Sequence, residues 1–110
     1  MAISPPPNAR YPNVSVPLGC LVPATLDGLL AAGRNLSSDA ATHSFMREIP
    51  QCWAMGQAAG VAAAVAVAAG ARVREVNVAA VQRQLAKQGA WLPPRDSCGP
   101  RRRCRPPREP

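Results

Sequence analysis

The sequence is dominated by an uncharged, alanine-rich run between Pro50 and Gly70. Proline has a fixed φ that suits the first turn of a helix, and its missing N–H is one that no carbonyl within the helix could use. Glycine is the residue that most often ends a helix, because it tolerates the left-handed conformation found there. The run therefore predicts one long helix that begins near Pro50 and stops at Gly70, and the rest of the chain leads into this helix or follows it.

The start of this helix is a candidate binding site. We expect the backbone amides of Gln51, Cys52 and Trp53 to point out of the helix without acceptors, and such amides attract a negative or strongly polarised oxygen. Gly56 and Gly60 lie one turn apart on one face. Their lack of side chains would let another backbone or a flat ligand come close to the helix axis.

The same run is long enough to span a membrane, and its two glycines match a pattern of membrane helix dimers. However, 10 of residues 52–71 are alanine, which gains little from transfer into lipid, and aromatic residues do not flank both ends. We therefore predict a helix buried in a soluble protein and no membrane partner. The N-terminus lacks an apolar run and contains Pro5-Pro6-Pro7, which argues against a secretory signal and favours a cytoplasmic location.

Composition divides the chain into three parts. Residues 1–13 are predicted to be an irregular, proline-rich lead, residues 14–92 a folded segment, and residues 93–110 a disordered tail rich in proline and arginine. The run Arg101–Arg105 makes a small basic nucleic-acid-binding protein one alternative. Because no aromatic residues are interleaved with these arginines, we do not expect nucleic acid as a partner.

The cysteines predict neither a metal site nor a disulfide framework. The four cysteines include no CxxC pair, and the single histidine, His43, is far from all of them in sequence. We therefore predict no metal. A second alternative is a non-enzymatic helical protein, in which Gly56 and Gly60 serve only the packing of helices.

Before the long helix, the pattern predicts short strands. Residues 14–22 have strand-like composition interrupted by Pro17 and Gly19, and residues 23–28 have turn chemistry. Residues 29–32 form a short, continuously apolar run, which fits a strand buried in a parallel sheet. The fold class predicted is thus an α/β fragment with short strands and two main helices.

Ligands of open α/β sheets bind at the carboxyl ends of the strands, which here is the loop that begins at Gly33. Gly33 permits close approach of a ligand, Arg34 supplies a forked donor and Ser37 adds a hydroxyl. We expect this loop to continue to Arg47, three residues before Pro50, so that Arg34 and Arg47 flank the start of the long helix.

A second helix is predicted after residue 76. Asn77 is a suitable N-cap, Val78, Val81 and Leu85 keep helical spacing, and Gly89 is a suitable residue to follow the helix.

Three segments stand out in their order and spacing: VPLGCLVP at residues 16–23, LLAAGRNLS at residues 29–37 and REIPQCWAMGQAAG at residues 47–60. Together they resemble the C-terminal end of a FAD-dependent oxidoreductase family. Each motif is weak by itself, but the set is specific in this order and spacing, and the likeness continues through Leu92. The resemblance implies that residues 14–92 are the C-terminal part of a Rossmann-like FAD-binding domain.

In that family, a glycine-rich loop near the N-terminus of a much longer chain holds the ADP half of FAD, and the C-terminal segment closes over the flavin. The resemblance places the Gly-Arg loop near the ribityl or pyrophosphate group, the helix start under the flavin pyrimidine, and Arg47 near the flavin or substrate as a weak catalytic candidate. The cofactor-binding residues implied are Gly33, Arg34, Ser37, Pro50, Gln51, Cys52 and Gly56. A helix N-terminus also suits the negative charge that develops around N1 and C2=O of a reduced flavin.

The chain departs widely from the family: its glycines never fall at the GxGxxG spacing, and the residues after Leu92 match no part of the family pattern. We therefore expect a truncated, flavin-closing segment that does not catalyse alone. FAD would be bound only together with the missing N-terminal half, which a separate gene could encode.

Overall fold

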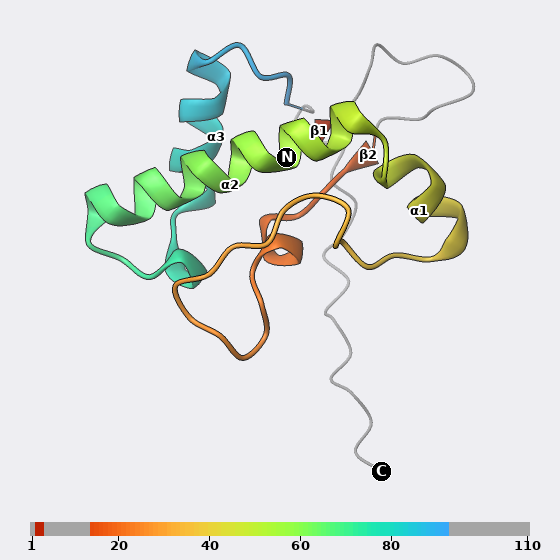
Figure 1. Cartoon of the computed structure of the whole chain (residues 1–110). Helices are drawn as coiled ribbons and strands as arrows, with labels where there is room; N and C mark the ends of the chain where they lie inside the picture. Colours follow the sequence, from red (N-terminus) through yellow and green to blue (C-terminus); the bar gives the residue numbers. More distant parts are fainter. Residues whose placement is uncertain (1, 4–13, 93–110) are drawn as a thin grey trace.

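The structure, a computed structural model, describes residues 2–3 and 14–92. Figure 1 shows one long helix, α2, running through the molecule, with α1 at its N-terminal end and α3 packed against it. The elements in chain order are β1 (Ala2–Ile3), β2 (Val14–Ser15), the 3-10 helix η1 (Leu18–Leu21), α1 (Ala40–Met46), α2 (Ile49–Ala69), the 3-10 helix η2 (Val73–Glu75) and α3 (Val78–Lys87).

The long helix is where the sequence predicted it. It starts at Ile49, one residue before Pro50, and ends at Ala69. Gly70 follows in the left-handed conformation, with φ 60°, and its N–H bonds to the carbonyl of Val67 at 3.1 Å. This geometry satisfies a carbonyl at the helix end and excludes further helical turns.

The core lies between one side of α2 and the elements around it. Its three largest fully buried side chains, Leu21, Met55 and Leu85, come from η1, α2 and α3. The remaining buried apolar residues are Val16, Met46, Ala58, Val61, Ala62, Ala66, Val76 and Val81. Because α2 contributes mainly alanines to this core, neighbouring segments pack close to its backbone.

The second predicted helix is confirmed as α3. Asn77 caps it, and its side-chain oxygen accepts a hydrogen bond from the Ala79 N–H at 3.0 Å. Val81 and Leu85 are buried, as their spacing predicted, and Gly89 adopts a φ of 79° after the helix. Leu92 packs against the core, whereas Trp91 is 44% exposed.

The predicted α/β fold class is wrong, because the described part of the chain is helical. Residues 29–32 are not a strand: Ala31 makes one backbone bond to another segment, from its N–H to the Leu21 carbonyl at 2.8 Å, and Leu29 is exposed. In the segment 14–22, strand pairing extends over two residues, with Ser15 opposite Ala2. An apolar run indicates burial, but a strand also requires a neighbouring strand to receive its hydrogen bonds.

The expected loop between Arg34 and Arg47 contains a helix, α1, which corrects a second prediction. Asp39 caps α1: its Oδ1 accepts a hydrogen bond from the Thr42 N–H at 2.7 Å. Hydrogen bonds from the backbone and side chain of Thr42 hold the pKa of the exposed Asp39 carboxyl below its usual value. An Asp followed by alanines was the available signal for this short helix.

The termini were predicted to be disordered. Apart from Ala2 and Ile3 of β1, the proline-rich lead lies outside the described residues, and so do the tail at residues 93–110 and its arginine run.

Candidate functional site

The candidate site is the junction between α1 and α2. α1 ends at Met46, Arg47 and Glu48 form a two-residue connection, and α2 starts at Ile49. The Glu48 N–H bonds back to the Phe45 carbonyl at 3.3 Å, which keeps the connection tight. The Glu48 carboxylate does not cap α2, so the first turn of this helix has no side-chain acceptor of its own.

Only some of the backbone amides that were predicted to lack an acceptor at the start of α2 do so. The Cys52 N–H is already used, because it bonds to the Glu48 carbonyl at 3.1 Å, and Trp53 is one residue further inside the helix. Because α2 starts one residue before Pro50, the N–H groups without an acceptor belong to earlier residues than predicted. Among the three predicted donors, the Gln51 N–H is the one that has no acceptor among the described residues.

Arg34 links the loop to the helix start. Gly33 has a φ of 117° and its carbonyl accepts from the Leu36 N–H at 3.2 Å, so the chain turns tightly here. The Arg34 Nε then donates to the Arg47 carbonyl at 3.2 Å. The predicted meeting of these two arginines is thus found, although Arg47 takes part through its backbone. The two Nη atoms of Arg34 make no hydrogen bond with another described residue.

Cys52 faces the same carbonyl. Its Sγ lies 3.8 Å from the Arg47 oxygen and 4.0 Å from the Met46 oxygen. A thiol is a weak donor, and these contacts place it at the α1–α2 junction, half-buried. Arg34 and Cys52 therefore both converge on the carbonyl of Arg47.

Gln51 carries a buried polar atom that has no partner. The residue is 4% exposed, and its Oε1 accepts no hydrogen bond. Leaving a buried acceptor unpaired costs about 1–3 kcal/mol, so its retention in a small core calls for a reason. The sequence identified Gln51 through its backbone amide and gave no sign of this orphaned carbonyl.

Three other predicted residues are not drawn into this cluster. Ser37 is exposed and makes no side-chain hydrogen bond within the described residues, and Pro50 is exposed in the first turn of α2. Gly56 is also exposed. It lies five positions after Gln51, which is about 140° around a helix, so the two positions face nearly opposite sides of α2.

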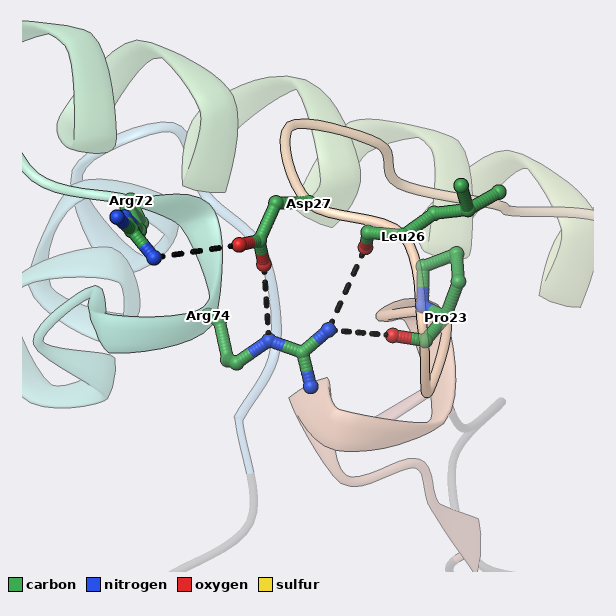
Figure 2. A network of polar contacts seen from close by, with 5 residues as sticks. All are labelled: Pro23, Leu26, Asp27, Arg72 and Arg74. Carbon is green, nitrogen blue, oxygen red and sulfur yellow. Dashed lines mark hydrogen bonds and ion pairs between the residues drawn. The ribbon is translucent and has the colours of Figure 1, made fainter.

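A cavity of about 360 Å³ lies elsewhere in the molecule, between η1 and residues 73–78. None of the predicted site residues lines it. Its charged lining residue, Arg74, is engaged in a network that Figure 2 shows: its Nε donates to the Asp27 Oδ1 at 3.1 Å, and its Nη2 to the carbonyls of Pro23 and Leu26 at 2.8 and 3.3 Å.

Arg72 adds a second ion pair to Asp27, at 3.3 Å. This network, which sequence reasoning missed, fastens the turn at residues 23–28 to η2 (Figure 2). Its hydrogen bonds join two segments of the same chain, so we assign it a structural role.

Two further properties bear on function. Among the described residues, no three His, Cys, Asp or Glu side chains lie together in a way that could hold a metal ion. By length and composition α2 is apolar enough to cross a membrane.

Comparison with known proteins identifies one family. A family model described as FAD dependent oxidoreductase matches residues 4–85, more than half of the chain. No curated protein matches the chain, and neither does a solved structure.

Proposed function

Because the chain belongs to the FAD-dependent oxidoreductase family, we propose that residues 14–92 form the segment that closes over the flavin in such an enzyme. The observation that supports this proposal most is the bond from the Arg34 Nε to the Arg47 carbonyl. It fastens the Gly33-Arg34 loop to the start of α2, so that a free guanidinium edge and an open helix start lie at one place.

The residues at this place fit the polar edge of a flavin. The open Gln51 N–H and the positive end of the α2 dipole suit a carbonyl oxygen or a delocalised negative charge. The two free Nη atoms of Arg34 suit the same kind of acceptor. The unpaired Oε1 of Gln51 suits an N–H donor, which the pyrimidine ring of a flavin also carries.

In this arrangement the chain contributes binding and electrostatics. FAD, when bound, would exchange electrons with a small organic substrate. Arg34 would hold and orient the cofactor, and the first turn of α2 would favour extra negative charge on the nearby ring edge. Arg47, whose side chain is exposed and makes no bond with a described residue, is the candidate for a contact with the flavin or the substrate.

The phosphate-binding function must come from elsewhere, because the glycines of this chain never form GxGxxG. A loop of that type cradles the pyrophosphate of a dinucleotide at a helix N-terminus. The proposal therefore includes a partner, the N-terminal half of the FAD-binding domain. The segment is inactive without this half, and we place the assembled enzyme in the cytoplasm.

The experiment combines the full chain with the GxGxxG-containing N-terminal part of a family member, adds FAD and removes unbound FAD by gel filtration. We expect the complex to retain visible flavin absorbance, and Arg34→Ala to weaken FAD binding by about tenfold, since a charge-assisted contact is lost. Gln51→Met should also weaken FAD binding, because the methionine thioether is only a weak acceptor in place of the glutamine carbonyl.

The matched control is Arg83→Ala, which removes an exposed arginine of α3 outside the proposed site. This variant should retain as much flavin as the unchanged chain. A complex that retains no flavin, or an Arg34→Ala complex that binds FAD as tightly as the control, would contradict the proposal.

A further inference from the structure

The cavity between η1 and residues 73–78 has the size of a small binding site. Its volume is about 360 Å³, at the lower end of the range found for small-molecule sites in proteins. A water molecule takes up about 30 Å³ in the liquid, so the cavity offers room for about twelve waters, or for a ligand of fewer than about ten heavy atoms. No residue of the α1–α2 junction lines it, so it is separate from the candidate flavin site.

The walls of this cavity are mainly aliphatic. The branched apolar residues that line it are Leu18, Val22, Val73, Val76 and Val78. Gly19 of η1 lines it as well, and a Cβ atom built at Gly19 would meet nothing within 4 Å, so there is open space over this residue. Val78 is 47% exposed, which leaves part of its apolar surface for contact with a bound molecule. The walls therefore suit a hydrocarbon group.

Arg74 places a fixed charged donor at this cavity. It is the one charged residue among the described residues that line it. Its Nε and Nη2 are held by the Asp27 carboxylate and by two backbone carbonyls. Its third nitrogen, Nη1, makes no hydrogen bond with a described residue, and in Figure 2 it points away from these acceptors and toward η1, which lines the same cavity. Because the guanidinium is already held, a ligand that bonds to Nη1 orders little that is not ordered beforehand.

The charges around Nη1 favour an anion. Asp27 has one negative charge and pairs with both Arg72 and Arg74, so this group of three side chains carries a net positive charge. Glu75, the next acidic residue, is exposed and does not line the cavity. A carboxylate accepts a stronger hydrogen bond from a guanidinium than a neutral oxygen does. A ligand with an anionic end and an apolar body would therefore match both the donor and the walls.

We propose that this cavity binds a small aliphatic carboxylate, with its hydrocarbon chain against the aliphatic walls and its carboxylate at the Nη1 of Arg74. Arg74 then has two roles, because two of its nitrogens fasten the turn at residues 23–28 to η2 and the third binds the ligand. The site lies apart from the flavin site and does not depend on the proposed function.

The test titrates the full chain with hexanoate and follows the methyl NMR signals of its valines and leucines. We expect saturable shifts of the signals around the cavity, with a dissociation constant below about 1 mM. Hexanol, which has the same carbon chain without the charge, is the matched control ligand. It should bind at least about tenfold more weakly, because it lacks the charged acceptor for Arg74.

Two variants locate the site. Gly19→Leu fills the cavity from a position where an added Cβ meets no neighbour, and it should raise the dissociation constant for hexanoate at least about tenfold. Arg74→Gln should do the same, because it removes the charged donor. The matched controls are Ala86→Leu, at an exposed position of α3, and Arg72→Gln, which removes an exposed charge outside the cavity. Each control should change the constant less than about threefold.

Circular dichroism should show unchanged helix content in Gly19→Leu, so this variant tests the site even where Arg74→Gln loosens the turn that Arg74 fastens. The inference is overturned if hexanoate causes no saturable shift up to about 10 mM, or if hexanol binds as tightly as hexanoate. Equal binding by Gly19→Leu and Ala86→Leu also overturns it, because hexanoate would then be bound elsewhere on the chain. Hexanoate binding as expected, together with a reconstituted complex that retains no flavin, would contradict the proposed function alone.

Discussion

Replacing Gly56 and Gly60, two glycines in the interior of α2, by alanine should stabilise the isolated chain. Gly56 and Gly60 lie in the interior of α2, have negative φ, and have open space where a Cβ would stand. Alanine is favoured over glycine in a helix interior by about 1 kcal/mol, which gives about 2 kcal/mol for the pair. For a chain of this size that gain corresponds to a rise in Tm of about 8–16 °C.

The measurement is thermal and urea unfolding followed by circular dichroism at the helix band. Gly70→Ala is the matched control, because a Cβ there also meets no neighbour but the residue has a φ of 60°. That variant should be destabilised by about 1 kcal/mol, since an L-residue is disfavoured in the left-handed region. A double variant at Gly56 and Gly60 that is no more stable than the unchanged chain would show that these glycines already serve packing within the chain, and would refute the reasoning that both positions have room for a Cβ atom.

Three further predictions follow from the polar contacts. An NMR titration should show the pKa of the Asp39 carboxyl below its ordinary value of 3.8. Its contribution to folding stability is therefore present above that pH and is lost as the pH falls through the lowered pKa. Asp39→Asn should keep the helix cap but remove this pH dependence of stability. Arg74→Ala should destabilise more than Arg72→Ala in urea unfolding, because Arg74 also holds two backbone carbonyls, whereas an exposed ion pair alone contributes about 0–1 kcal/mol; equal effects would argue against the network as a fastener. Gln51→Met should stabilise the isolated chain by about 1–3 kcal/mol, since it removes a buried acceptor without a partner, and a loss of stability in the same assay would mean that the acceptor is satisfied in solution.

The helices were predictable to the extent that their signals are local. Pro50 and Gly70 mark the ends of α2 within one residue, and Asn77 and Gly89 bracket α3, because caps act through neighbouring backbone groups. The strand predicted at residues 29–32 was wrong for the opposite reason. A strand forms only where a second segment pairs with it, and an apolar run does not show whether such a segment is present.

The candidate site was partly predictable for similar reasons. Arg34 and the start of α2 were expected together, and the contact with the Arg47 carbonyl confirms it. The exact donors depended on where α2 begins, and a shift of one residue placed the Cys52 amide inside the helix. The burial of the Gln51 side chain depends on how other segments pack around α2, which no single stretch of sequence specifies.

The central claim is that this chain supplies the part of a FAD site that contacts the flavin, while the GxGxxG-containing N-terminal half supplies the rest. The most direct measurement is the FAD dissociation constant of the GxGxxG-containing N-terminal part of a family member, determined with and without the full chain. The account predicts that the chain tightens FAD binding by at least about tenfold and that Arg34→Ala removes most of this gain. An FAD affinity that is the same with and without the chain would contradict it.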